Sequence, residues 1–155
     1  MSRLRRTMLP ALLAAAPWIA LAGSAPAGPV YRSPLAIAVA RDGRTLYVSD
    51  KTARCVVVLD AASGKPVRSI PVPGEPHGLA PAPDGKTLYV AERKAHAVAV
   101  LDTAKGAVTG RIAVGAWPVA VTLSPDGKRL YSCNRGDHSV SVVDRAAGKE
   151  IQRIP

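Results

Sequence analysis

Residues 82–102 read APDGKTLYVAERKAHAVAVLD, a Pro-Asp-Gly turn followed by two short apolar runs. Closely similar arrangements stand 42 residues earlier and 42 residues later, and no insertion or deletion separates the three copies. A repeat of this length is typical of solenoids, propellers and other arrays. The chain is therefore expected to contain three copies of one structural unit.

Turn residues are among the most regular positions of the repeat. In each copy an Asp-Gly pair suits a tight hairpin in which the Gly takes a left-handed conformation. A second Asp, before the last strand of each copy, can accept hydrogen bonds from nearby backbone N–H groups. The predicted structural turn residues are Asp42, Gly43, Asp84, Gly85, Asp126, Gly127, Asp60, Asp102 and Asp144.

Each copy also holds four short apolar runs, which in the first copy span residues 36–40, 45–49, 55–59 and 66–70. Val, Ile and Thr are abundant, and the apolar spacing of helices is absent. The third run is apolar on both faces, so its sheet must be covered on both sides. These features predict an all-β chain, a β-propeller of four-stranded antiparallel blades. About three blades are present, as an open or partial propeller.

A known repeat shares these residues. Leu46-Tyr47-Val48-Ser49-Asp50, followed by Val56-Val57-Val58-Leu59-Asp60, resembles the YVTN-type β-propeller repeat of exported bacterial and archaeal proteins. The third copy matches the motif's turn at residues 124–128, and Asn134 keeps the Asn of the motif. The resemblance covers residues 34–155. It implies the propeller fold and no particular activity.

The N-terminus carries a different signal. Residues 1–27 combine three Arg, a short apolar run and small residues, which is the plan of a secretory signal peptide. The apolar run is short of the roughly 20 residues that span a bilayer, so no stable membrane span is expected after cleavage. A linker is expected at 28–33 and blades at 34–75, 76–117 and 118–155. The mature chain is expected in the periplasm, secreted or at the cell surface, where nucleic acid is not an expected partner despite the net charge of +10.

Three blades pose a problem of closure, because propellers close with typically four to eight blades. An open array of three leaves two apolar faces without a cover. The favoured interpretation is that these residues are the N-terminal part of a longer propeller. The alternative is self-association, in which two chains pair to close the ring.

Polar side chains gather in the loops between second and third strands (50–54, 92–96, 134–138), and Glu75 and His77 lie in one of the loops before a first strand (71–77, 113–119). Propeller topology brings these loops to one rim, which we call the loop rim. Such a rim could bind a protein or a small-molecule partner, for example an anionic ligand. The candidate ligand-binding residues are His77, His96, His138, Arg93, Arg135 and Asn134.

The sequence offers little support for catalysis. The repeated Asp residues recur once per blade, whereas a catalytic site uses one or two carboxylates. Only Glu75 is expected near the channel, which disfavours a metal-dependent lactonase. Imidazoles one blade apart rarely converge on one metal. We therefore expect no catalytic activity, no catalytic residue and no metal site in this chain.

No Cys-x-x-Cys-His occurs, so no cofactor is expected in this chain, and haem could be held only by a downstream or partner module. Cys55 and Cys133 lie in different copies and are expected to remain unpaired small apolar side chains. Trp117 is expected to pack between neighbouring blades.

Three functional hypotheses follow. The first is an exported propeller that acts as a scaffold or binding module through its loop rim. The second is the propeller portion of a periplasmic redox protein associated with a c-type or d-type haem module, in which His77 would be an axial ligand or contact the haem edge. The third is a hydrolase at the channel rim that depends on Glu75. Fold alone does not choose among them.

Overall fold

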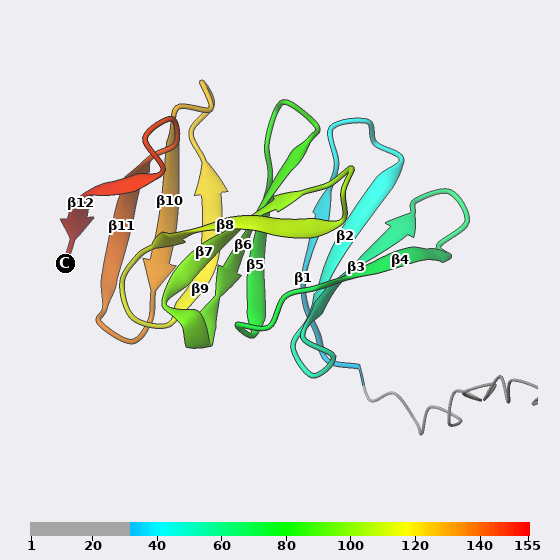
Figure 1. Cartoon of the computed structure of the whole chain (residues 1–155), viewed down its shortest axis with the longest axis horizontal. Coiled ribbons are helices and arrows are strands. Elements are labelled where there is room, and N and C mark those ends of the chain that lie inside the picture. The colour runs from blue at the N-terminus through cyan, green and yellow to red at the C-terminus, as the bar shows by residue number, and fades with distance from the viewer. Residues whose placement is uncertain (1–31) are drawn as a thin grey trace, which may run out of the picture.

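The computed structural model describes residues 32–155, which form three four-stranded antiparallel sheets in chain order (Figure 1). Blade 1 contains β1 (Pro34–Val39), β2 (Thr45–Asp50), β3 (Cys55–Asp60) and β4 (Pro66–Pro71). Blade 2 contains β5 (Pro76–Pro81), β6 (Thr87–Glu92), the 3-10 turn η1 (Arg93–Ala95), β7 (Ala97–Asp102) and β8 (Ala107–Ala113). Blade 3 contains β9 (Pro118–Leu123), β10 (Arg129–Asn134), β11 (Ser139–Asp144) and β12 (Lys149–Ile154). The predicted all-β, partial propeller is confirmed.

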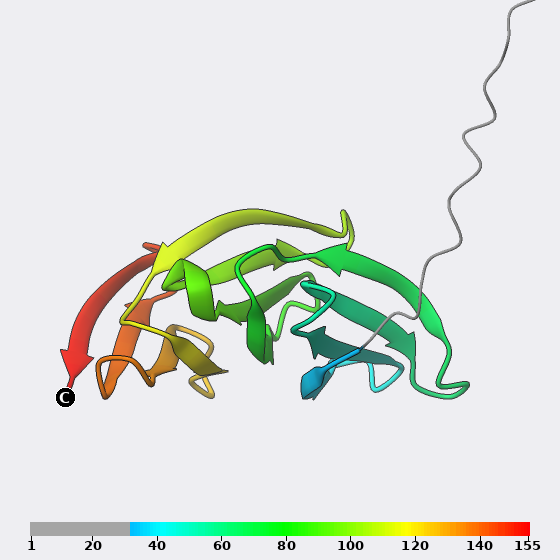
Figure 2. The ribbon, with the colours of Figure 1, turned by 90° about the horizontal axis from the view of Figure 1, so that it is seen from below.

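Within each blade the strands lie side by side in the order of the sequence. The first strands β1, β5 and β9 line the inner side of the arc, and β4, β8 and β12 lie on its outer side (Figure 2). β5 packs between β1 and β9. The predicted signal peptide lies outside the described residues, as does most of the predicted linker. Residues 32–155 contain no helix long and apolar enough to cross a membrane.

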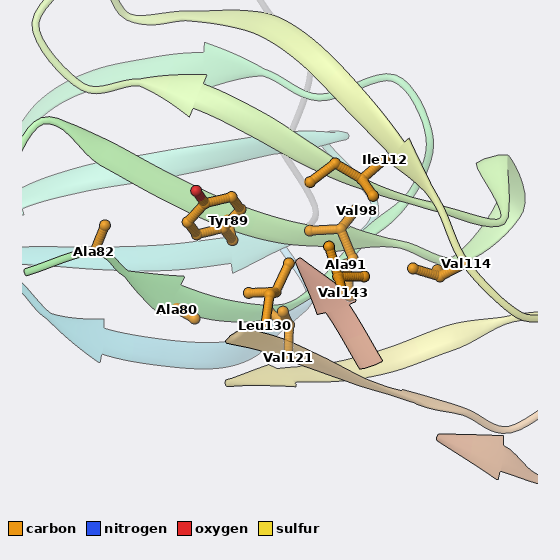
Figure 3. Close-up of a cluster of buried hydrophobic side chains, with 10 residues drawn as sticks. All are labelled: Ala80, Ala82, Tyr89, Ala91, Val98, Ile112, Val114, Val121, Leu130 and Val143. Carbon is orange, nitrogen blue, oxygen red and sulfur yellow. The ribbon is translucent and has the colours of Figure 1, made fainter. Parts of the chain in front are cut away.

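Two apolar clusters join the blades. Between blades 2 and 3, Tyr89, Val98 and Ile112 pack with Leu130 and Val143 (Figure 3). A second cluster, between blades 1 and 2, uses six of the matching positions one repeat earlier in the chain and three others; its members are Tyr47, Val56, Val58, Ile70, Val72, Leu88, Val90, Ala99 and Leu101. Blade 2 contributes both of its faces to these clusters, which explains why its third strand is apolar on both sides.

The turn residues behave as the repeat predicts. Gly43 has a φ of 67°, and Gly64, in the second turn of blade 1, has a φ of 68°. Asp42 Oδ1 accepts hydrogen bonds from the backbone N–H groups of Arg44, at 2.8 Å, and Thr45, at 3.0 Å. These two turns recur in blades 2 and 3, with left-handed Gly at every repeat. They form the rim opposite to the loop rim, which we call the hairpin rim: residues 41–44, 60–65, 83–86, 102–107, 125–128 and 144–149.

The two outer faces of the array are uncovered. Six of the seven large hydrophobic side chains that are exposed among residues 32–155 belong to blades 1 and 3: Leu35, Ile37, Val39, Val67, Ile151 and Ile154. Cys133 is also exposed, although the sequence predicted an apolar packing role for it. Its repeat equivalent, Ala91, is fully buried against blade 3. Cys133 is exposed because no blade covers that side of β10.

Candidate functional site

The loop rim is assembled by backbone hydrogen bonds between neighbouring loops. The N–H of Arg93, after β6, donates to the carbonyl of Glu75 in the blade 1–blade 2 connection at 3.0 Å. One repeat later, the N–H of Arg135 donates to the carbonyl of Trp117 at 3.0 Å. The connections between blades and the loops after the second strands are therefore held side by side, and their side chains share one surface.

The last residue of each second strand is buried beneath this rim. Asp50 accepts hydrogen bonds from the N–H groups of Ser33 and Ala53. Glu92 accepts one from the N–H of Gly74 at 3.1 Å and pairs with Arg111. Both carboxylates thus hold the connections that lead into their blades.

Asn134 takes the third of these positions and is 2% exposed. Its Nδ2 donates to the hydroxyls of Ser139, at 3.0 Å, and Ser141, at 2.8 Å, and its Oδ1 accepts from Ser132. The sequence placed Asn134 among the ligand-binding side chains. Its polar atoms instead form hydrogen bonds within the protein, because the side chain is buried beneath the loop. Asn134 is therefore placed to position the loop rim.

The three candidate histidines lie apart. His77 is half-buried on β5, with Nε2 3.5 Å from Glu75 Oε1. His96 is exposed, and its Nδ1 accepts a hydrogen bond from the N–H of Trp117 at 3.2 Å. His138, on the loop of blade 3, is exposed. Among residues 32–155, no group of three His, Cys, Asp or Glu side chains is arranged to hold a metal ion.

A cluster around Glu75 is the most charged feature of the rim. Glu75 is 4% exposed and has a left-handed backbone, with a φ of 66°. Its Oε1 lies 3.5 Å from Lys51 Nζ and 3.3 Å from Arg93 Nη1, and its Oε2 lies 3.1 Å from Lys94 Nζ. With His77, four basic side chains surround one carboxylate.

These contacts set the charge states of the cluster. Burial by itself raises the pKa of Glu75, but the bonds from Lys94 and His77 and the charges of Lys94 and Lys51 outweigh it and lower the pKa from 4.5 to about 2. Burial lowers the pKa of His77, and the bond to Glu75 offsets only part of this effect. Near neutral pH, Glu75 is therefore ionised and His77 is neutral.

From the sequence, Glu75 is predicted only as a carboxylate near the channel, and its ring of cations is not predicted. A signal was present. Lys51 and Arg93 are repeat equivalents, and Glu75 lies in the connection that runs between their two blades. Basic side chains at matched positions of adjacent blades could therefore have been expected to flank it.

Trp117 differs from its expected role. It is 47% exposed and lies on the loop rim, with the Arg93 guanidinium 4.9 Å from the centre of its ring. The space between blades 2 and 3 is already filled by smaller side chains such as Ala91 and Val98. The indole is therefore displaced to the surface, where it stacks with Arg93 and lies close to Gly136.

Arg135 and Asp137 end the rim on blade 3. Arg135 is exposed. Asp137 accepts hydrogen bonds from the N–H of Ala116 at 2.9 Å and the hydroxyl of Ser139 at 2.7 Å, and it pairs with Arg153 at 3.2 Å. Asp137 is therefore the exposed acid of the loop rim, and it is already engaged by protein groups.

The rim as a whole presents cations. It contains five Lys or Arg residues and four acids, and three of these acids are buried: Asp50, Glu75 and Glu92. The hairpin rim carries eight Lys or Arg and six Asp, none of them buried. An approaching ligand would thus meet mixed charge on the hairpin rim and mainly positive charge on the loop rim.

Comparison with known proteins places the chain in a family. The family described as "Lactonase, 7-bladed beta-propeller" matches residues 21–112, which is more than half of the sequence. The chain belongs to this family. No curated protein matches the chain. The more specific YVTN-type assignment remains a resemblance of the repeat residues.

Two solved structures share the fold of this family member. Hydrazine synthase of Kuenenia stuttgartiensis is 28% identical with a TM-score of 0.73, over 84% of this chain and 39% of that chain. U3-55K is 19% identical with a TM-score of 0.67, over 79% of this chain and 39% of that chain. The chain therefore spans well under half of either protein, and U3-55K supports the fold alone.

Proposed function

We propose that this member of the lactonase propeller family is a binding module that engages an acidic partner through its loop rim. The observation that carries the proposal is the contrast between the rims. Five residues other than Gly have a positive φ among residues 32–155, and all five lie on the loop rim: Arg54, Glu75, His96, Trp117 and His138. Such a backbone costs an L-residue roughly 1 kcal/mol or more, and such outliers cluster at functional sites.

Electrostatics supports the same proposal. The exposed side chains of the loop rim include Lys51, Arg54, Lys94 and Arg135, and the exposed acid Asp137 is already paired. Complementary charge increases the rate of encounter with a partner and helps to select it. An acidic protein segment or an anionic small molecule matches this surface.

The uncovered apolar faces support a place in a larger ring. In blade 2, Leu88, Val90 and Leu101 are fully buried against blade 1. The equivalent face of blade 1 forms a depression of about 300 Å³, lined by Val48, Val57 and other side chains. A further blade of the same repeat type would cover this face. We propose that the three blades work as part of a longer propeller, and the predicted leader at 1–27 supports export of that protein.

Charge reversal on each rim in turn tests the binding function. The probe is a fluorescently labelled peptide of glutamate residues, and its binding to the chain is followed by anisotropy at low salt. Arg54→Glu with Arg135→Glu, on the loop rim, should weaken binding roughly fivefold or more, because two favourable charges become unfavourable. Lys65→Glu with Lys86→Glu, on the hairpin rim, is the matched control with the same change in net charge.

An equal loss in both double variants would contradict the proposal, because binding would then depend on net charge alone. Turnover of simple lactones that Glu75→Gln abolishes would replace the binding module by the hydrolase hypothesis. No such turnover is expected, since Glu75 is held by cations.

A redox assembly is the second candidate function. The observation that favours it is the 28% identity to hydrazine synthase. In this case the propeller would adjoin a haem module, and His77 would face the haem. A haem absorption band in the full-length product, changed by His77→Ala, would support it. Purified product without such a band would exclude it.

A further inference from the structure

The cations around Glu75 converge on the volume of a single carboxylate. Lys51 Nζ and Arg93 Nη1 approach the same oxygen, Oε1, at 3.5 and 3.3 Å. Lys94 Nζ approaches the other oxygen at 3.1 Å. The cationic groups of three side chains from two blades are thus close enough together for one small oxyanion to contact them at once.

One carboxylate does not neutralise three permanent cations. Glu75 contributes a single negative charge, and His77 is neutral near pH 7 because burial lowers its pKa. The cluster therefore keeps a surplus of positive charge. The cationic side chains remain accessible, with exposed fractions of 62% for Lys94, 46% for Lys51 and 30% for Arg93. Each retains N–H donors beyond the one that faces Glu75.

The cluster is also ordered before any ligand arrives. Arg93 is held between Glu75 and the ring of Trp117. The N–H of Lys94 donates to the carbonyl of Gly74 at 3.0 Å, which ties the loop after β6 to the connection that carries Glu75. A ligand would therefore lose little binding free energy to the gathering of these side chains.

We propose that Lys51, Arg93 and Lys94 form a binding site for a multivalent oxyanion, a phosphate or polycarboxylate group, and that Glu75 holds the three cations together. The guanidinium offers a planar pair of donors that suits such groups, and the ammonium groups add point charges. Convergence on one point favours a compact oxyanion over an extended acidic surface. This inference rests on the proposed binding function of the loop rim and names the chemistry that one part of it recognises.

Titration calorimetry with inorganic phosphate, and separately with citrate, tests the site at low salt. Lys94→Ala should weaken binding roughly fivefold, since it removes the most exposed of the three cations. Lys86→Ala, on the hairpin rim, makes the same change in net charge and should leave the affinity unchanged. Binding of either anion that depends on Lys94 supports the site, and the stronger of the two identifies the preferred group.

Glu75→Gln distinguishes a ligand site from a purely structural ion cluster. Gln keeps the size of the side chain and an oxygen acceptor but removes the negative charge that competes with the ligand. Phosphate affinity should therefore rise even though the melting temperature falls. A purely structural cluster would show the lower melting temperature without tighter binding, and this result would overturn the site.

The proposal is also overturned when neither anion binds, or when Lys94→Ala and Lys86→Ala weaken binding equally. These failures are separate from failure of the proposed function. The glutamate peptide assay uses Arg54 and Arg135, which lie outside the Glu75 cluster. A rim that still binds the peptide but no phosphate or citrate would keep its binding function and lose the oxyanion site.

Discussion

The hairpin rim and the loop rim carry different residues at backbone positions of the same kind. Both contain turns in which the chain needs a positive φ. On the hairpin rim all six of these positions are Gly, and each is preceded by an Asp at a spacing that is the same in all three copies. On the loop rim the five positions carry side chains, and the copies differ, with Glu75 in one connection and Trp117 in the next.

This difference separates what the fold requires from what a site can use. A Gly in a left-handed turn avoids a steric cost, and an Asp beside it satisfies the backbone N–H groups of the turn. A charged or aromatic residue in the same conformation bears that cost and gains a side chain at a fixed place on the surface. The hairpin rim is therefore the part that defines the blade, and the loop rim is the part that can differ from blade to blade.

The largest expected effect compares a carboxylate from each rim. Glu92, under the loop rim, is fully buried, accepts a hydrogen bond from Gly74 and pairs with Arg111. Glu92→Ala should lower the free energy of unfolding by about 2 kcal/mol, because it removes a buried acceptor of the Gly74 N–H and breaks a charge pair with the half-exposed Arg111. Denaturant unfolding followed by circular dichroism measures this change.

Asp102→Ala, on the hairpin rim, is the matched control. Asp102 Oδ1 accepts two backbone hydrogen bonds, from Ala104 and Lys105, but it lies at the surface where water can replace it. Asp102→Ala should therefore lower the free energy of unfolding clearly less than Glu92→Ala does. Equal losses would show that burial does not distinguish the two rims.

A second effect concerns acid. The contacts of Glu75 lower its pKa from the ordinary value of 4.5 to about 2. A carboxylate with a lowered pKa stabilises the fold above its unfolded pKa, and this contribution disappears as the pH falls through the folded pKa. The stability difference between the parent chain and Glu75→Gln should therefore persist from neutral pH down to about 4.5, and should shrink between about 4.5 and about 2.

Unfolding curves of both proteins at several pH values measure this difference. The hairpin-rim carboxylates also have lowered pKa values, but mainly through hydrogen bonds within their own turns, as for Asp42. If the stability difference between the parent and Glu75→Gln stayed constant throughout the acid range, the surrounding cations would not be lowering the pKa of Glu75.

The fold could be predicted because its repeat unit occurs three times in the sequence. A period of 42 residues with matched Asp-Gly turns identifies a repeat unit, and the β-branched runs within it identify the strands. Neither signal depends on which residues meet in the folded protein. Errors such as the exposure of Cys133 come from the ends of the array, where the repeat pattern continues but the neighbouring blade is not present to cover it.

The site could be predicted only in part. Propeller topology brought His77 and Arg93 to one rim, yet the partners of Glu75 come from two blades and from three stretches of sequence, at 51, 77 and 93–94. Their meeting depends on how one blade packs against the next, which no local pattern encodes. The burial of Asn134 was not predicted, because a polar residue next to a loop is expected to face solvent, whereas this one is buried and bonded to Ser139 and Ser141.

The smallest expected effect exchanges residue types between the rims. Gly43 has a φ of 67° and open space where a Cβ would lie, so Gly43→Ala should cost only the steric penalty of a left-handed Ala, about 1 kcal/mol. His138 has a φ of 52°. His138→Gly should remove a similar steric penalty from the folded state. This gain in stability should offset the loss that comes from the greater conformational freedom of Gly in the unfolded chain.

Thermal melts should therefore show a lower midpoint for Gly43→Ala and an unchanged or higher midpoint for His138→Gly. A marked loss of stability in His138→Gly would mean that the imidazole contributes contacts that outweigh its backbone strain. The left-handed side chains of the loop rim would then be structural, as the glycines of the hairpin rim are. If His138→Gly is instead as stable as the parent, its side chain is not retained for stability, and a role in binding becomes the better account of why a strained position carries one.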